Sequence, residues 1–237
     1  MIREHYKATP AQFCERIHAV GPHVVLGHMT HLNLDVDPDI LKKTGTSVAH
    51  NPTSNAKLAD GIAPIPQMLE AGINVCIGSD GAPCNNNHDL FRDMHLAGVI
   101  HKARSNNAKL LPAEQILEMA TINAAKALGI DKDLGSLEVG KKADFVVIDP
   151  SGLHAAPYDP SHIGEKGGIH PPTLVVHSCS GRDVDMVIIN GEVVVEKGRL
   201  TRVDEDQIKR AAREAIVGIR KRSGISAQPL KMNWQYV

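Results

Sequence analysis

Three short apolar runs near the front of the chain each lead into a polar residue. The runs and the residues they lead to are 24–28 with His28, 46–50 with His50, and 73–81 with Asp80. Each run is rich in β-branched side chains and is bounded by Gly, Pro or Asn, which is typical of a buried strand. We therefore expect three strands that end in polar residues.

Segments with helical spacing of apolar residues lie between and after these runs. Two of them carry Pro in the first turn and Gly at the end, which is the usual pattern of a helix start and stop. The expected helices are Asp37–Gly45, Pro66–Gly72, Asp89–Arg104 and Pro112–Leu128. Strands that alternate with helices predict an α/β protein with parallel βα units.

The pattern changes after Gly129, where strand signals follow one another without helices between them. A strand is expected at Phe145–Asp149. A hairpin is expected from Val184–Ile189 and Val193–Glu196, which are joined by Asn190-Gly191. Asn-Gly between two apolar runs is the strongest short hairpin signal. We infer a small β module appended to the βα region.

These patterns divide the chain into three parts. Residues 1–134 form the βα region, and residues 135–200 form the β module. The module contains a loop insert at 149–172 that is rich in Gly, Pro and His. Residues 201–237 hold a charged amphipathic helix, from about Asp204 to Lys221, and a tail. The tail has no periodicity, and we expect it to be frayed.

The composition is that of a globular protein without affinity for polyanions. Apolar residues make up 42% of the chain and charged residues 22%, which argues against disorder. With 26 basic and 27 acidic residues the net charge is −1, so neither nucleic acid nor a membrane is expected as a partner. The 4 cysteines form no CxxC pair. We expect free thiols in a reducing compartment and therefore a cytoplasmic location.

Parallel βα folds place functional side chains at the carboxyl ends of strands, where His28, His50 and Asp80 lie. Imidazole and carboxylate groups are the usual ligands and general bases of a hydrolytic zinc site. Each residue also has a structural alternative. His28 could be a hydrogen-bonded strand-end residue, and His50 could fix the turn made with Asn51-Pro52. Asp80 could cap the next helix.

Two polar stretches follow the second and third expected strands. The amides of Asp80–Asn87 could contact a substrate, or the stretch could be the entry loop of a helix, because Asn and Asp are favoured N-caps. Asn51–Asn55 has the same two interpretations. Cys84 has no base beside it in sequence, so a nucleophilic role is not expected. The sequence contains no P-loop, GxGxxG, GxSxG or HExxH motif.

A series of short motifs runs from about Glu4 to about Arg199. The motifs are Gly27-His28, Ala49-His50-Asn51-Pro52-Thr53-Ser54-Asn55, Gly78-Ser79-Asp80-Gly81-Ala82 with Asn85-Asn86, Met119–Ala125, Gly135–Asp144, and Asn190-Gly191 with Gly198-Arg199. Together they resemble the amidohydrolase superfamily. They are most similar to its ATZ/TRZ branch, which includes methylthioadenosine/S-adenosylhomocysteine deaminases, guanine-type deaminases and triazine hydrolases.

The resemblance implies an α/β fold that combines two pieces. One is the C-terminal part, strands six to eight, of a metal-dependent (β/α)8 hydrolase barrel, and the other is part of a small composite β-sandwich. It implies a hydrolase acting on carbon–nitrogen bonds other than peptide bonds. A small heterocycle, purine-type or related, is the implied substrate.

The resemblance also implies roles for individual residues. Asp80 is the implied ligand of a divalent metal, zinc first and iron second, and accepts a proton from the attacking water. His28 orients that water, which replaces an amino or chloro substituent of the heterocycle. His50, Asn55 and Asn86 are the candidate substrate-binding residues.

The sequence departs from this family in one large respect. Family members carry a His-x-His pair on the first barrel strand and a His-x-x-Glu on the fifth, and neither lies in its place here. Asp80 is then the one clear metal ligand, whereas a catalytic zinc usually has three protein ligands. We expect that the chain alone does not hold the metal and is inactive or nearly so. It needs a missing N-terminal half or an oligomeric partner.

Three interpretations follow from this departure. The chain is a truncated product of a deaminase-like enzyme, a non-catalytic binding or assembly module that keeps half of the scaffold, or one half of a split enzyme. The residues do not choose among adenosine derivatives, guanine, cytosine-like bases and triazines as substrate. The reason is that the selecting side chains lie largely in the absent half.

Overall fold

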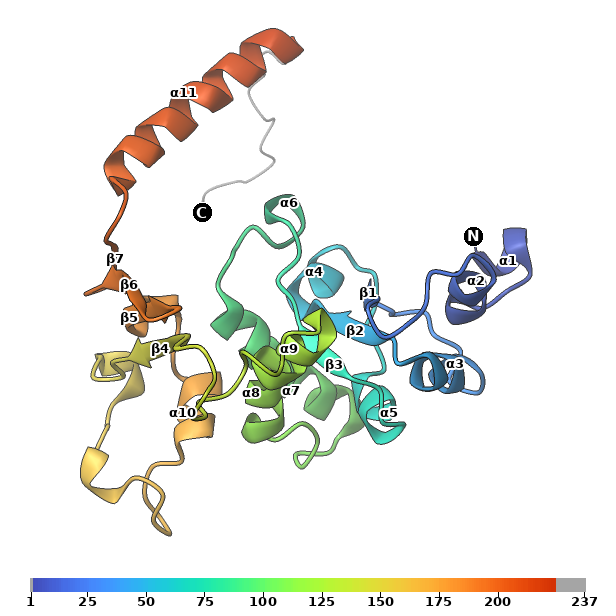
Figure 1. The fold of residues 1–237 in the computed structure, drawn as a ribbon, viewed down its shortest axis with the longest axis horizontal. Coiled ribbons are helices and arrows are strands. Elements are labelled where there is room, and N and C mark those ends of the chain that lie inside the picture. Colours follow the sequence, from blue (N-terminus) through green and yellow to red (C-terminus); the bar gives the residue numbers. More distant parts are fainter. Residues whose placement is uncertain (1, 225–237) are drawn as a thin grey trace, which may run out of the picture. The chain divides into compact units, whose positions relative to one another are not determined.

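The computed structural model describes residues 2–224 of the chain. The chain divides into two compact units, Met1–Gly198 and Arg199–Val237. In the first unit, strands that alternate with helices are followed by an antiparallel sheet (Figure 1). The predicted α/β class and the change of pattern after Gly129 are therefore confirmed.

The elements of the first unit have the following bounds. Its helices are α1 (Ile2–Tyr6), α2 (Pro10–Arg16), α3 (Asp37–Thr44), α4 (Pro52–Lys57), α5 (Ile65–Glu70), α6 (Ala82–Asn85), α7 (Leu90–Ser105), α8 (Ala113–Ala120), α9 (Ile122–Leu128) and α10 (Pro171–His177). Single 3₁₀ turns lie at Leu153–Ala155, Pro160–His162 and Gly181–Asp183. Its strands are β1 (Val25–Gly27), β2 (Ser47–His50), β3 (Val75–Ile77), β4 (Phe145–Ile148), β5 (Val184–Ile189) and β6 (Glu192–Glu196).

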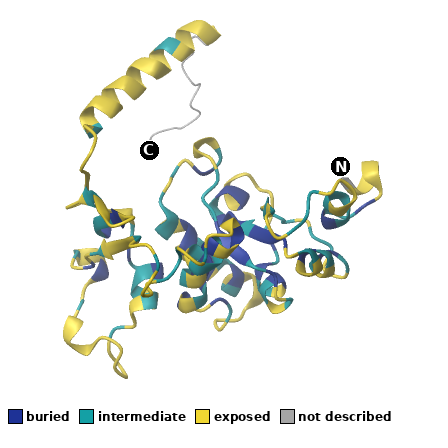
Figure 2. Cartoon of the chain, in the orientation of Figure 1, coloured by how far each residue is buried: buried dark blue, intermediate teal, exposed yellow. Residues whose placement is uncertain are grey.

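The strands β1, β2 and β3 form a parallel sheet in that order. Its register aligns Leu26 with Val48 and Val48 with Val75, so these three side chains share one face. Val48 and Val75 are fully buried, and Leu26 packs against the same core. The helices contribute the rest of this core, including Leu41, Ile65, Met68, Met94, Ile116 and Met119. Figure 2 shows the buried residues gathered around β2, β3 and the neighbouring helices.

The opposite face of the sheet carries small residues, because the same register aligns Gly27, Ala49 and Cys76. Asn51, just after β2, packs against the backbone that leaves the strands on either side. A Cβ atom added to Gly78 would lie 2.4 Å from Oδ1 of Asn51, closer than any real carbon contact. A Cβ atom added to Gly27 would lie 3.7 Å from Nδ2 of Asn51, which is ordinary contact. Gly78 therefore permits a close approach that any other residue would block.

The antiparallel sheet of the first unit pairs β4 with β5 and β5 with β6. Asn190 and Gly191 have φ values of +51° and +81°, which a two-residue hairpin turn of the primed type requires. The predicted hairpin is confirmed, with β5 at the expected residues and β6 starting one residue earlier.

Two predictions about helices are wrong. The single helix expected over Pro112–Leu128 is two helices, α8 and α9, because Thr121 between them has φ −127° and ψ −95°. Its hydroxyl donates to the carbonyl of Leu117 at 2.6 Å, which satisfies an acceptor of the last turn of α8. The loop insert at 149–172 ends early, because Pro171 begins α10.

The second unit contains β7 (Arg199–Leu200) and α11 (Glu205–Ser223). The side chain of Asp204 caps α11 by accepting from the amides of Asp206 and Gln207, so the predicted helix is confirmed. The expected frayed tail falls mostly in residues 225–237, outside the described residues. Among the helices of residues 2–224, none has the length and apolar character needed to cross a membrane.

The contact between Gly78 and Asn51 gives a test of the fold. We expect Gly78→Ala to lower the free energy of unfolding by about 1–3 kcal/mol, because the added methyl group would overlap the buried amide side chain of Asn51. Gly27→Ala is the matched control and should change stability far less. Urea unfolding of both variants measures the difference. Asn51→Ala in the Gly78→Ala background should recover part of the loss, and equal effects of the two glycine variants would contradict this packing.

Candidate functional site

His28 and Asp80 follow β1 and β3 at the same edge of the parallel sheet. Both have left-handed backbone conformations, with φ values of +66° and +61°. Residues other than glycine adopt this region rarely, and such positions concentrate at functional sites. The amide of His28 donates to the carbonyl of Ala49 at 2.9 Å, which holds the turn after β1 against β2.

The side chains of His28 and Asp80 face each other across a short gap. Nε2 of His28 lies 3.8 Å from Oδ2 of Asp80, which is longer than a hydrogen bond. Their side chains are 38% and 23% exposed, so solvent reaches both. A polar contact of this length is the kind that a water molecule bridges. The structure thus brings together the two residues that the sequence offers as catalytic groups.

The helix α4 supplies a hydrogen-bond partner to each of these side chains. The hydroxyl of Ser54 donates to Oδ2 of Asp80 at 2.5 Å. Nδ1 of His28 lies 2.7 Å from Oδ1 of Asn55. Ser54 and Asn55 are both buried. Ser54 is not among the residues predicted from the sequence, although it lies in the polar stretch Asn51–Asn55.

The environment of Asp80 favours its charged form. The hydrogen bond from Ser54, and after it the one from the backbone amide of Gly81, lowers the pKa of Asp80 below its ordinary value. The Gly81 amide donates to Oδ1 at 2.5 Å, so each carboxylate oxygen has a protein donor, and the thiol of Cys84 is a further hydrogen-bond partner of the carboxylate. The side chain is therefore an anion at neutral pH, as a metal ligand or a proton acceptor must be.

The buried carboxylate of Asp93 on α7 connects the loop after β3 to α4. Its Oδ2 accepts from Nδ2 of Asn85 at 3.0 Å, and its Oδ1 accepts from the amide of Thr53 at 3.3 Å. Nδ2 of Asn85 also donates to the carbonyl of Ser79 at 2.6 Å. These bonds fix the backbone on both sides of Asp80 and at the start of α4. No pattern in the sequence pointed to Asp93, because its partners are distant along the chain.

His50, predicted to bind substrate, does not lie with His28 and Asp80. Its side chain is buried on the helix-facing side of β2, and its Nε2 lies 3.2 Å from Nε2 of His101 on α7. Burial, and after it the charge of His101, lowers the pKa of His50 to about 3. Burial, and after it the charge of Arg104, lowers the pKa of His101 to about 4. Both rings are neutral at pH 7, so one Nε2 donates and the other accepts.

Asn86, the third predicted substrate-binding residue, ends α6 in a left-handed conformation and is exposed. Its Oδ1 accepts from Nζ of Lys57, which also donates to the carbonyl of Pro83 at 2.8 Å. Its hydrogen-bond partners therefore lie on α4 and α6, and it has no hydrogen bond to His28 or Asp80 within residues 2–224. Contact of Asn86, His50 or Asn55 with a substrate stays a prediction.

The part of the chain that the structure describes supplies an incomplete metal site. Within residues 2–224 no group of three His, Cys, Asp or Glu side chains is placed to hold a metal ion. The anionic, part-exposed carboxylate of Asp80 suits a divalent cation as one ligand of several. The described residues can therefore supply one ligand of a metal site, but not the complete set of ligands.

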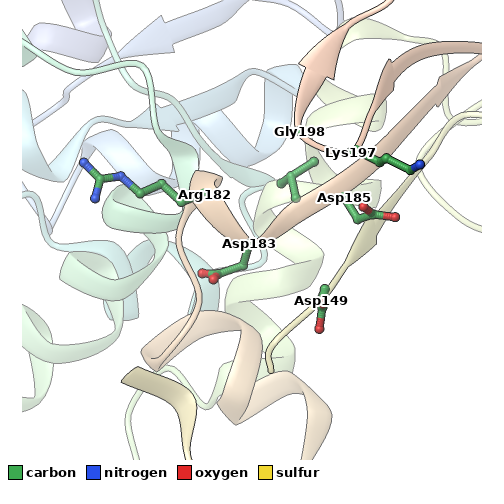
Figure 3. A pocket seen from close by; sticks show the side chains of 7 residues that line it. Asp149, Arg182, Asp183, Asp185, Lys197 and Gly198 are labelled. Atoms are coloured by element: carbon green, nitrogen blue, oxygen red, sulfur yellow. The ribbon is translucent and has the colours of Figure 1, made fainter. Parts of the chain in front are cut away.

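A cavity of about 230 Å³ lies at the antiparallel sheet and contains none of the predicted site residues. It is lined by Asp149, Arg182, Asp183, Val184, Asp185, Lys197 and Gly198 (Figure 3). The carboxylate of Asp183 already contacts Nε2 of His154 at 3.0 Å and the amide of Ser180 at 2.7 Å. The amide of Gly198 donates to the carbonyl of Asp185 at 3.0 Å. These groups hold the strands and turns together, and we assign the cavity no ligand.

A parallel sheet with an imidazole and a carboxylate at one edge is typical of hydrolases built on βα units. A family model described as the amidohydrolase family matches residues 1–194. The chain belongs to this family, and the resemblance drawn from its motifs is confirmed.

Two curated relatives are deaminases. The chain is 41% identical over 204 residues to 5-methylthioadenosine/S-adenosylhomocysteine deaminase of Acetivibrio thermocellus, a match that covers 86% of this chain and 45% of the relative. It is 42% identical over 216 residues to 5'-deoxyadenosine deaminase of Methanosarcina acetivorans, with 90% and 46% covered. The chain spans about half the length of the curated relatives it matches.

Solved structures give the same picture. A zinc-bound adenosine deaminase from Xanthomonas campestris superposes with a TM-score of 0.84 at 31% identity, covering 93% of this chain and 48% of that one. The zinc complex of atrazine chlorohydrolase from Arthrobacter aurescens superposes with a TM-score of 0.78 at 28% identity, covering 91% and 45%. The chain therefore has the fold of one half of these proteins.

The pair of buried histidines predicts an acid-sensitive fold. Because the folded pKa values of His50 and His101 lie below the ordinary value of 6.5, the unfolded state binds protons first as the pH falls. Their contribution to stability is complete above about pH 6.5 and is lost progressively as the pH falls toward the folded pKa values, about 4 for His101 and about 3 for His50. We expect the free energy of unfolding, measured in urea, to fall across this window.

Variants separate this pair from other titrating groups. His50→Leu/His101→Leu should flatten the pH dependence, whereas His170→Gln, at an exposed histidine 3.2 Å from Glu114, should keep it. His101→Leu alone leaves Nε2 of His50 without its partner and should cost about 1–3 kcal/mol at pH 7. An unchanged slope in the double variant would refute the assignment.

Proposed function

We propose that this chain carries the His28 and Asp80 half of a metal-dependent deaminase site. The reaction is hydrolysis of a carbon–nitrogen bond other than a peptide bond, at the amino-bearing ring carbon of an adenine-type nucleoside. The observation that carries the proposal is the 3.8 Å approach of Nε2 of His28 to Oδ2 of Asp80 at one edge of the parallel sheet. The similarity to 5-methylthioadenosine/S-adenosylhomocysteine deaminase and to 5'-deoxyadenosine deaminase supports the choice of substrate class.

The proposed architecture follows from the unpaired sides of the two outer strands of the parallel sheet. Among the described strands, β1 and β3 each pair on one side only, and strands of a closed barrel have no free edge. We propose that β1, β2 and β3 are strands six to eight of a (β/α)8 barrel, within residues 1–134. Residues 135–200 then form part of a composite β-sandwich, and residues 201–237 form a C-terminal extension.

The chemistry assigned to the two side chains is proton handling around one water molecule. The water oxygen forms a bond to the ring carbon, the carboxylate of Asp80 accepts the water proton, and the bond from carbon to the amino nitrogen breaks. The amino group leaves as ammonia after it gains a proton. The imidazole of His28 accepts a hydrogen bond from the same water and orients it.

The metal contributes to this chemistry, but the described residues hold it only in part. A zinc or iron ion, when bound, supplies a nucleophile at neutral pH by lowering the pKa of water to about 7. Asp80 is its proposed ligand in this chain. A catalytic zinc usually has three protein ligands, so we propose that the others come from polypeptide outside residues 1–237. This source is an N-terminal half or another subunit, and the chain alone is expected to be inactive or nearly so.

A fusion tests the proposal. In it, this chain replaces the segment that it matches in the Acetivibrio thermocellus deaminase. We expect the fusion to bind zinc and to release ammonia from 5-methylthioadenosine, whereas the chain alone does neither. Asp80→Asn in the fusion should lower kcat by about 10²–10⁴-fold, the usual contribution of a positioned proton acceptor.

The control is Asp60→Asn, since Asp60 is exposed on the segment that follows α4. It should leave kcat unchanged. A folded fusion that binds zinc but deaminates no adenine nucleoside would rule out the proposed function and favour a binding module. An Asp80→Asn variant as active as the parent would rule out the role of Asp80.

A further inference from the structure

We infer that Ser54 and Asn55 are positioning residues that set the two catalytic groups from one helix. Ser54 holds the carboxylate of Asp80, and Asn55 holds the imidazole of His28 with its proton on Nδ1. The inference rests on the proposed function for its catalytic meaning. Its structural content, the protonated nitrogen of His28, can be measured on this chain without metal or substrate.

The position of α4 explains how neighbouring residues reach two different strands. Successive side chains on an α-helix point about 100° apart, so adjacent residues near the start of α4 address different partners. Ser54 bonds Asp80 beyond β3, and Asn55 bonds His28 beyond β1. The start of the helix is held against α7, because the amide of Thr53 donates to Oδ1 of Asp93 at 3.3 Å. Both positioning side chains are buried, at 0% and 2% exposure, and have little freedom to move.

The hydrogen bond between His28 and Asn55 decides which ring nitrogen of His28 carries the proton. An amide oxygen can only accept, so Nδ1 of His28 must donate to Oδ1 of Asn55 at 2.7 Å. A neutral imidazole has one N–H, so Nε2 then carries a lone pair. That lone pair faces Oδ2 of Asp80 at 3.8 Å, and the carboxylate is also an acceptor.

Two acceptors that face each other require a donor between them. Water has two O–H donors and can satisfy Nε2 of His28 and Oδ2 of Asp80 together. The Nδ1–H form of His28 therefore turns the gap into a slot that orients water by both of its hydrogens. The other tautomer would place an N–H toward Asp80 and would favour a direct ion–dipole contact without the water.

The role of Ser54 is to limit the carboxylate to one orientation. Its hydroxyl occupies one lone pair of Oδ2, and the Gly81 amide occupies one of Oδ1. The thiol of Cys84 is a further partner of the carboxylate, and the lone pairs that these three groups do not use are left for a metal or for water. Without the hydroxyl the part-exposed carboxylate would rotate and lose its alignment with Nε2 of His28.

The alternative to this arrangement is the reversed orientation of the Asn55 side-chain amide. Nδ2 of Asn55 has no hydrogen-bond partner in the described part of the chain. Reversing the amide would give Nδ2 a partner in Nδ1 of His28, but would leave Oδ1 of Asn55 without one and would move the histidine proton to Nε2. The two orientations therefore differ in one observable, the protonated nitrogen of His28.

Nitrogen NMR of the histidine ring reads this observable directly. The chain is labelled with nitrogen-15 histidine, and long-range proton–nitrogen correlations are recorded at about pH 8, above the ordinary pKa of histidine. The signals of His28 are identified by their loss in His28→Gln. We expect the protonated nitrogen to be Nδ1. A protonated Nε2 would overturn the inference.

Variants of Asn55 test the cause of the tautomer. Asn55→Leu removes the acceptor at similar size and should shift His28 toward the Nε2–H form that a free imidazole prefers. Asn55→Asp keeps an acceptor oxygen and should preserve the Nδ1–H form. Asn74→Leu is the matched control, because Asn74 is a part-buried amide just before β3, at the far end of the sheet, that bonds Ser47 and the carbonyl of Asn123. A tautomer that ignores Asn55→Leu, or that changes in Asn74→Leu, would overturn the inference.

The role of Ser54 is tested in the fusion of this chain with the Acetivibrio thermocellus deaminase. Ser54→Ala should lower kcat by about 10- to 100-fold with little change in KM, the usual effect of losing a hydrogen bond to a charged group. Ser54→Thr retains the hydroxyl and should restore much of the rate. Ser54→Cys has a similar size and a weaker donor, so it replaces the alanine variant if that variant fails to fold. Ser47→Ala, at a buried hydroxyl at the start of β2, should leave kcat unchanged.

The two proposals fail in different experiments. An inactive fusion together with an Nδ1–H form of His28 removes the proposed function and leaves the structural inference intact. An active fusion with His28 in the Nε2–H form removes the inference and leaves the function. A kcat that is the same in Ser54→Ala and in the parent removes the positioning role of Ser54.

Discussion

The parallel pairing of β1, β2 and β3 in one register is the constraint on which the candidate site depends. It brings the residues after β1 and β3 to one edge, although 52 positions of the sequence separate His28 from Asp80. It also brings the backbone at Gly78 so close to Asn51 that a methyl group cannot fit. The start of α4 is thereby fixed against the strand ends, and its side chains reach both catalytic candidates.

Two histidines at strand ends have opposite environments because one belongs to its strand and the other lies in the turn that follows its strand. His50 is the last residue of β2 and points into the helix-facing core, where it pairs with His101 and stays neutral. His28 lies just past β1 in a left-handed turn, which directs its ring toward Asp80 and solvent. Burial therefore gives one ring a structural task and leaves the other available for chemistry.

The same edge of the sheet concentrates acceptors. Asp80 is anionic, and the bond to Asn55 turns the lone pair of His28 toward it. Such an arrangement attracts a cation or a doubly donating water, which is the requirement of a hydrolytic site. The chain matches about half of the length of each deaminase relative. Within residues 2–224 it likewise supplies only part of the ligand set that a metal site needs.

Local periodicity, turn chemistry and short motifs were enough to predict the α/β alternation, the hairpin at Asn190-Gly191, the family, and the importance of His28 and Asp80. The break at Thr121, the burial of His50 against His101, and the hydrogen bonds of Ser54 and Asn55 became visible only in the folded chain. The contact between His50 and His101 and the hydrogen bonds of Ser54 and Asn55 each join residues more than 25 positions apart. Such contacts are made by packing of whole elements, and no local pattern encodes them.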